Sequence, residues 1–141
     1  MYCSVAAWKP RATQWREMLR RATAFNQNQE IRSLLLHGEG RYVQWLEGPS
    51  AALAPLWTRI RSDPRHVQVT LLHRAPRPVH PIHLHAHRPL AAQGPMGLVE
   101  MVHAVRDLYL NAQVDRGIKA REDAARVVDT ILTLKAPSGT D

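Results

Sequence analysis

Residues 34–49 read LLLHGEGRYVQWLEGP, and this stretch decides the fold. Two segments rich in apolar residues flank Gly38-Glu39-Gly40, a combination that is typical of a tight turn between antiparallel strands. The sequence therefore predicts a β-hairpin, with one strand over residues 30–37 and the returning strand over residues 41–47.

Gln44 is the unusual member of the returning strand. Side chains alternate along a strand, so Gln44 shares one face with Tyr42 and Leu46. A primary amide offers two donors and two acceptor lone pairs, and leaving them unpaired in a protein interior is costly. Alternation alone leaves two options open: Gln44 points into the layer between sheet and helices, or it points to water.

The regions around the hairpin extend the pattern. Residues 1–7 predict a short strand, and residues 12–25 carry apolar side chains at helical spacing. A second helix opens at Gly48-Pro49-Ser50, and Pro55 suggests that its regular part starts there. Two further strands are expected at residues 67–73 and 82–87. The order is β-α-β-β-α-β plus a fifth strand, which predicts an α+β, ferredoxin-like sandwich with two helices on one face of a mixed sheet.

The remainder of the chain predicts two amphipathic helices, punctuated by Pro95 and Gly117. We expect residues 1–90 to form the α+β domain. Residues 91–141 are expected to form a helical extension that packs on the sheet or mediates assembly, with a frayed tail. The apolar stripes of the two helices are Leu98, Met101, Val102, Val105 and Leu108, and Ala124, Val127, Val128, Ile131 and Leu132.

Composition narrows the class of protein. The chain has 141 residues, of which 45% are hydrophobic, so a packed core is expected rather than a disordered chain. No apolar run is long enough to span a bilayer, the first residues do not resemble a signal peptide, and Cys3 has no partner for a disulfide. We expect a cytoplasmic protein. The formal charge of +7 permits contact with acidic partners but says little about function.

The hairpin resembles the signature of BLUF domains, which are flavin-based blue-light sensors. The Tyr2-Cys3-Ser4 segment resembles the family's Tyr-x-Ser, and Asn26 falls where the family keeps a flavin-binding asparagine. The spacings from Tyr2 to Asn26 and from Asn26 to Gln44 match the family's without a gap. The segment RIRSDPRH resembles the end of the family's second helix and supplies the remaining matched positions, Arg59, Asp63, Arg65 and His66.

The resemblance implies a photoreceptor that binds FAD. Light would drive electron and proton transfer from Tyr2 to the flavin, after which the Gln44 amide would reorient or tautomerise. Asn26 and Gln44 would contact the flavin ring, and Arg59 and Arg65 would suit the ribityl and phosphate end. Asp63 and His66 would act near that end or structurally. We expect no enzymatic activity, a downstream signalling protein as partner, and assembly as a homo-oligomer.

Two departures from the family leave an alternative open. The family reads Ile-Thr-Gly where this chain has Ile31-Arg32-Ser33, which adds a side chain near the expected pocket. The family's late Trp-x-Met segment is also missing. Its positions fall near His85 and His87. The alternative function is therefore a flavin-free, BLUF-like module for protein interaction or regulation.

The segment PVHPIHLHAH places His83, His85 and His87 on one face of a strand, with His80 nearby. Imidazoles at this spacing could bind a transition metal, but no cysteine or carboxylate cluster accompanies them, and we assign no metal. We also expect no nucleic-acid binding, because no helix-turn-helix or aromatic stacking motif accompanies the charge. No membrane contact is expected.

Overall fold

The computed structural model describes residues 1–76, the strand at residues 90–93, and residues 95–113 and 117–135. Within these ranges the chain forms five strands and four helices. In chain order the elements are β1 Tyr2–Ala6, α1 Ala12–Asn28, β2 Arg32–Gly38, β3 Arg41–Glu47, α2 Ser50–Ser62, β4 His66–Leu71, β5 Leu90–Gln93, α3 Leu98–Asn111 and α4 Ile118–Thr133.

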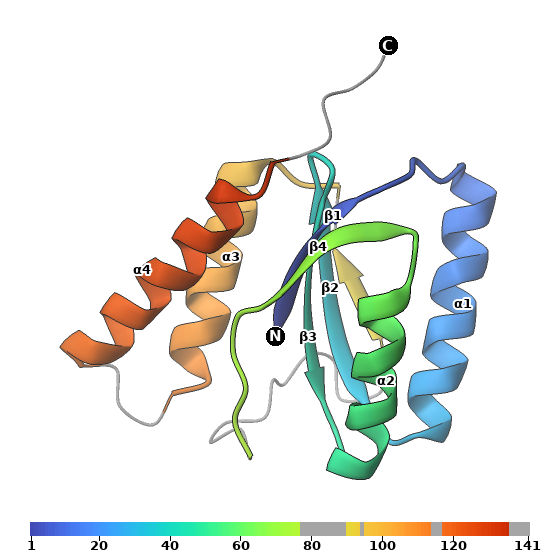
Figure 1. Ribbon diagram of the computed structural model, residues 1–141, viewed down its shortest axis with the longest axis horizontal. Helices are drawn as coiled ribbons and strands as arrows, with labels where there is room; N and C mark the ends of the chain where they lie inside the picture. Colours follow the sequence, from blue (N-terminus) through green and yellow to red (C-terminus); the bar gives the residue numbers. More distant parts are fainter. Residues whose placement is uncertain (77–89, 94, 114–116, 136–141) are drawn as a thin grey trace.

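The strands form one sheet in the order β4-β1-β3-β2-β5. Neighbouring strands are antiparallel except β2 and β5, which are parallel. Helices α1 and α2 lie on one side of the sheet, and α3 and α4 lie on the other (Figure 1). This confirms the predicted ferredoxin-like α+β fold, with a mixed sheet, two helices on one face and two further helices after the last strand.

The β2–β3 hairpin closes through Glu39 and Gly40. Both residues have positive φ, 47° and 71°, as a two-residue type I′ turn requires. Glycine accepts this conformation freely, whereas Glu39 does so at a local cost. A compensating contact is present, because Glu39 Oε1 accepts a hydrogen bond from the backbone N–H of Leu98, 3.0 Å away at the start of α3. The turn therefore also caps a helix.

The main hydrophobic core lies between the sheet and the C-terminal helices. Strand residues such as Cys3, Leu36 and Val43 pack with Met101 of α3 and Ile131 of α4, and all five are almost fully buried. The opposite face of β2 is also covered, since Leu35 is buried there. A strand that is covered on both faces does not need to alternate polar with apolar side chains, which explains the apolar run at residues 34–36.

The hairpin also holds the end of α4. The Arg41 guanidinium donates through Nη2 to the carbonyl of Leu134, at 2.8 Å, and through Nη1 to the carbonyl of Glu39, at 3.0 Å. The last turn of α4 has no basic residue of its own, so Arg41 supplies the cation that a helix C-terminus favours. Strand β3, which carries Gln44, is thereby attached to α4.

The predicted start of the second helix needs correction. The regular helix α2 begins at Ser50 and not at Pro55, because Ala52 and Leu53 already donate to the carbonyl of Pro49. Pro55 has no backbone N–H, so the helix lacks only one backbone hydrogen bond near its start and remains regular.

The structure describes a strand that the sequence did not predict, while the expected fifth strand is not tested. The segment predicted for it, residues 82–87, lies outside the described residues, and the strand that pairs with β2 is Leu90–Gln93. Its sequence LAAQ has little intrinsic preference for strand structure, so pairing with β2, rather than local sequence, accounts for it.

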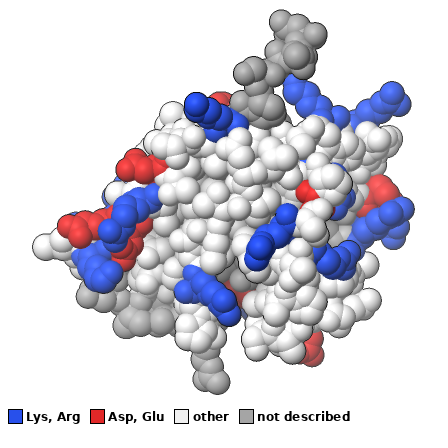
Figure 2. Space-filling model, in the orientation of Figure 1, with Lys and Arg blue, Asp and Glu red and all other residues white. Residues whose placement is uncertain are grey.

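The surface carries its charges in mixed order. On the face shown in Figure 2, basic side chains are interspersed with acidic ones both over α4 and on the side of α1. Ion pairs within the helices account for part of this pattern, for example Glu17 with Arg20 and Arg21. In the part of the chain that is described, no helix combines the length and the hydrophobicity that crossing a membrane requires.

Candidate functional site: a cavity between the sheet and helices α1 and α2

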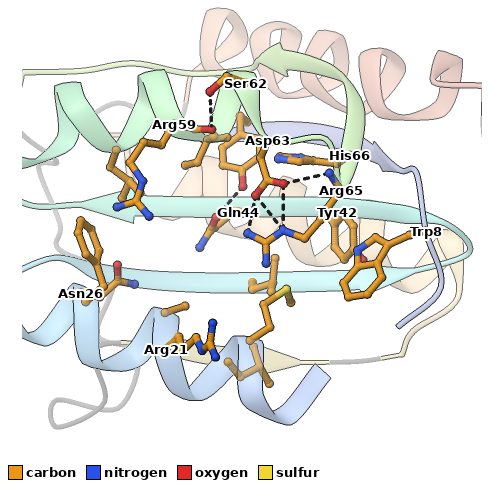
Figure 3. Close-up of a pocket in the computed structure, with 18 residues that line it drawn as sticks. Trp8, Arg21, Asn26, Tyr42, Gln44, Arg59, Ser62, Asp63, Arg65 and His66 are labelled. Carbon is orange, nitrogen blue, oxygen red and sulfur yellow. Dashed lines mark hydrogen bonds and ion pairs between the residues drawn. The ribbon is translucent and has the colours of Figure 1, made fainter. Parts of the chain in front are cut away.

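A cavity of about 550 Å³ lies between the sheet and helices α1 and α2. The floor is made by sheet residues, and the walls are made by the apolar stripes of the two helices (Figure 3). All seven side chains assigned to the site from the sequence line this cavity: Tyr2, Asn26, Gln44, Arg59, Asp63, Arg65 and His66. The fold therefore brings together groups that are up to 64 positions apart in the chain.

Tyr2 and Gln44 form a hydrogen-bonded pair on the cavity floor. They are direct partners in the antiparallel register of β1 and β3, so their side chains meet on the same face. The Tyr2 hydroxyl donates to Gln44 Oε1 at 2.6 Å. Burial, followed by the nearby Asp63 carboxylate, raises the pKa of Tyr2 well above its usual value. The phenol is therefore protonated at neutral pH and acts as the donor.

Aromatic rings hold Tyr2 from the side. The Trp57 ring of α2 lies 5.5 Å from the Tyr2 ring between centroids, and the His66 ring lies 6.2 Å away. Both pairs are tilted, a geometry that aromatic contacts favour. Tyr2 is only 5% exposed, so its ring has little freedom to leave the pair with Gln44.

Asn26 occupies another part of the cavity, in the last turn of α1. Its carbonyl accepts a hydrogen bond from the Ile31 N–H at 2.8 Å, and Glu30 takes the positive φ that turns the chain back into β2. Asn26 is helical and buried rather than the left-handed residue that ends the helix. Its Nδ2 donates to Ser33 Oγ at 3.0 Å.

The three arginines of the cavity differ in what surrounds them. Arg65 forms a bidentate ion pair with Asp63, which lowers the pKa of the Asp63 carboxyl. Arg21 pairs with Glu17. Arg59 instead lies over the ring of Phe25, with its guanidinium carbon 5.0 Å from the centroid. Among the described residues, Arg59 is the cavity arginine without an ion pair to an acidic side chain.

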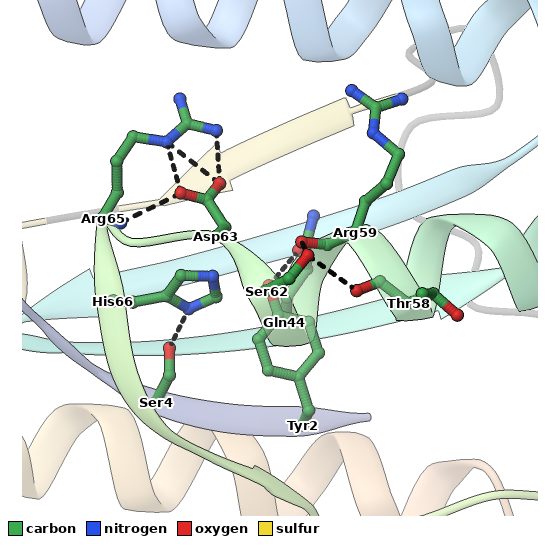
Figure 4. A network of polar contacts seen from close by, with 9 residues as sticks. All are labelled: Tyr2, Ser4, Gln44, Thr58, Arg59, Ser62, Asp63, Arg65 and His66. Atoms are coloured by element: carbon green, nitrogen blue, oxygen red, sulfur yellow. Dashed lines mark hydrogen bonds and ion pairs between the residues drawn. The ribbon is translucent and has the colours of Figure 1, made fainter.

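His66 connects the cavity to β1. Its Nδ1 is 2.8 Å from the Ser4 hydroxyl, and Ser4 is fully buried (Figure 4). Burial lowers the pKa of His66, because a charged imidazole is poorly solvated there. A neutral ring that is hydrogen-bonded to a strand residue fits a supporting role for His66 beside Tyr2.

Sequence reasoning missed several lining residues. Met18, Leu19 and Ala22 were identified only as an apolar stripe, and Trp8, Arg21 and Phe25 were not singled out, yet all six line the cavity. Periodicity locates such a stripe but does not tell a packed core from a cavity wall.

No group of three or more potential metal ligands occurs among the residues that the structure describes. The histidine segment at residues 80–87 lies outside them.

The arrangement suits one kind of ligand in particular. Apolar side chains on opposite walls accommodate a flat ring, and the amides of Asn26 and Gln44 offer donors and acceptors to the edge of that ring. The fold and the site thus define a small α+β domain with a ligand-sized cavity between its sheet and one pair of helices.

Comparison with known proteins identifies the family. The family model described as BLUF, sensors of blue-light using FAD, matches residues 1–80. The chain belongs to the BLUF family, which confirms the resemblance noted in the hairpin.

Two of the curated relatives are photoactivated adenylate cyclase subunits of Euglena gracilis. The beta subunit is 51% identical over 59 residues, which are 42% of this chain and 7% of that protein. The alpha subunit is 37% identical over 75 residues, which are 53% of this chain and 7% of that protein. The chain therefore matches only a small part of these relatives.

Solved structures share the fold at low sequence identity. A bacterial light-regulated adenylyl cyclase superposes with a TM-score of 0.61 at 16% identity, covering 99% of this chain and 41% of the other. BlrB, a BLUF protein in its dark state, gives a TM-score of 0.57 at 21% identity, covering 94% of this chain and 93% of the other. The match to BlrB thus extends over the C-terminal helices.

Proposed function

We propose that this chain is a blue-light photoreceptor that binds FAD in the cavity between the sheet and helices α1 and α2. The observation that carries the proposal is the hydrogen bond between Tyr2 and Gln44 on the cavity floor. A phenol paired with an amide that has a second bonding pattern is the switch element that such a sensor requires.

The residues present fit a flavin. The cavity volume of about 550 Å³ lies within the range of roughly 300–1,000 Å³ that is usual for small-molecule sites. Leu19 and Ala22 of α1 and Leu56 and Ile60 of α2 line the cavity, which provides apolar walls for the ring system. Asn26 and Gln44 supply the polar contacts to its carbonyl and ring-nitrogen edge.

Arg59 is the arginine best suited to the phosphates of FAD. It lacks an acidic partner among the described side chains, and its guanidinium lies over the ring of Phe25. The charge of Arg65 is already balanced by Asp63, so we assign Arg65 mainly to holding the loop after α2. A free guanidinium offers a bidentate site to phosphate oxygens.

Bound flavin would supply the absorption of blue light and an excited state that takes up an electron. Tyr2 would supply that electron and the proton of its hydroxyl transiently and take both back, so that neither group is oxidised or reduced at the end. Burial keeps that proton in place in the dark. Gln44 then exchanges one bonding pattern for another: Oε1 accepts from the Tyr2 hydroxyl in the observed arrangement, whereas after rotation of the amide Nε2 would donate to the Tyr2 oxygen. No substrate is converted.

The proposal is tested by absorption spectroscopy. We expect the protein purified in the dark with FAD to carry bound flavin, and its visible spectrum to shift to longer wavelength under blue light and return in darkness. Free FAD illuminated in the same buffer is the control. A colourless protein after reconstitution would instead support the flavin-free interaction module, and bound flavin without a reversible shift would contradict the photoreceptor role.

We further propose that the signal leaves through α3 and α4 to a downstream protein or to a second copy of the chain. Strand β3 carries both Gln44 and Arg41, and Arg41 holds the C-terminal end of α4 through the Leu134 carbonyl. Glu39 holds the start of α3 from the same hairpin. A change in the bonding of Gln44 that displaces β3 would therefore reach both helices.

Substitution of Arg41 by methionine tests this route. The variant keeps an unbranched side chain but loses the hydrogen bonds of the guanidinium to the carbonyls of Leu134 and Glu39. We expect light to change amide hydrogen exchange in α4 in the wild type and much less in Arg41→Met, while the flavin spectrum shifts in both. Arg61→Met, which removes an exposed arginine of α2, is the matched control. Equal responses of α4 in all three proteins would rule out Arg41 as the connection.

A further inference from the structure

Ser33, on the strand that follows the first helix, is hydrogen-bonded to the cavity residue Asn26. Asn26 Nδ2 donates to Ser33 Oγ at 3.0 Å, and the two residues are 4% and 6% exposed. A hydrogen bond between two side chains this deeply buried is well protected from water, so its loss would leave a buried amide N–H unpaired.

Rigid backbone fixes both partners of this bond. Asn26 lies in the last turn of α1, and its carbonyl is bonded to the Ile31 N–H at 2.8 Å. Ser33 lies in β2, where it is in register with Leu46 of β3 and Leu90 of β5. The distance between the two side chains is therefore set by the turn at residues 29–31 and by the sheet.

The bond selects one orientation of the Asn26 amide. An amide has two N–H donors and one carbonyl oxygen. With one N–H directed to Ser33, the other N–H and Oδ1 remain for the cavity, which Asn26 lines. A glycine at position 33, which is what the BLUF pattern carries there, has no side-chain acceptor for the same N–H.

We propose that Ser33 is a positioning residue of this chain: it orients the Asn26 amide before the flavin binds, so that the free N–H and Oδ1 face the ring edge. This inference rests on the proposed flavin site. Preorganisation of a polar group lowers the cost of binding, because the rotation of the amide is already restricted in the free protein. Ser33 thus acts on flavin through Asn26.

The test measures flavin affinity and the flavin carbonyl vibrations in Ser33 variants. Loss of a hydrogen bond of this kind corresponds to roughly a 3- to 10-fold change in a binding constant. We expect Ser33→Ala to weaken FAD binding by about that factor and to shift the infrared carbonyl bands of bound flavin. Ser33→Thr, which keeps the hydroxyl, should stay closer to the wild type in both readouts.

A double-mutant cycle separates positioning from a merely structural role. In an Asn26→Ala background, Ser33→Ala should have no further effect on FAD affinity, because the amide on which it acts is gone. Wild-type affinity and carbonyl bands in Ser33→Ala would overturn the inference and leave the photoreceptor proposal intact. Weaker binding with unchanged bands, or an equal loss in both backgrounds, would also overturn it. A wild-type protein that binds no flavin would overturn both proposals.

Discussion

Replacement of Gln44 by leucine should abolish the light-induced shift of the flavin spectrum. Leucine has nearly the same volume as glutamine but neither accepts from the Tyr2 hydroxyl, which is 2.6 Å from Gln44 Oε1 in the wild type, nor offers a second bonding pattern. We expect FAD to stay bound, weakened by at most about tenfold, since only one or two hydrogen bonds are lost. Absorption spectra in the dark and under blue light measure both effects.

Tyr42→Phe is the matched control for this prediction. Tyr42 lines the same cavity from the same strand face as Gln44, so the variant removes a phenol there but leaves the pair of Tyr2 and Gln44 in place. We expect it to retain a reversible shift. A shift of normal size in Gln44→Leu would refute the role assigned to the amide, whatever the control shows.

The fold follows closely from local patterns in the sequence. The Gly38-Glu39-Gly40 turn fixes the antiparallel pairing of β2 and β3, because a two-residue loop allows one register. The alternation along β3 then places Gln44 on one face and Val43 on the other, as observed in the cavity lining and in the core. These features depend on short-range geometry, which a sequence encodes directly.

The features that were missed depend on distant contacts. Strand β5 exists through its parallel pairing with β2, and nothing in its alanines favours a strand. Prediction from the sequence is limited in the same way for the helices α1 and α2. Their apolar stripes look like those of α3 and α4, yet no residue of α2 is buried, whereas three residues of α3 are. Only the assembled fold distinguishes a wall of the cavity from a wall of the core.

Some features of the candidate site were predicted from the sequence and others were not. Spacing along the chain, read through the family resemblance, selected seven side chains that line one cavity. The functional roles of these residues stay predictions. The sequence did not predict the hydrogen bond between Asn26 and Ser33. It indicated only that position 33 carries an added side chain. Which atom of that side chain meets which partner is decided by the turn at residues 29–31.

Substitution of Gly38 by alanine should strongly destabilise the protein. The backbone of Met96 passes so close to Gly38 that a Cβ there would lie 1.9 Å from the Met96 carbonyl oxygen and 2.9 Å from Met96 N. The same contact includes the hydrogen bond from Met96 N to the His37 carbonyl, at 3.0 Å. Backbone atoms cannot rotate away as a side chain would, so the segment leading into α3 must shift. Overpacking of this kind costs about 3 kcal/mol.

For a chain of this size, such a loss corresponds to a fall of roughly 10 °C in melting temperature, measured by circular dichroism in the dark. Gly97→Ala is the matched control, since its Cβ would meet nothing closer than Glu39 Oε1, 3.8 Å away, and its φ of −69° suits alanine. That variant should change stability by less than about 1 kcal/mol. If Gly38→Ala has the same melting temperature as the wild type, the segment before α3 is not in close contact with the hairpin. The contact between α3 and the hairpin would then depend on Glu39 alone.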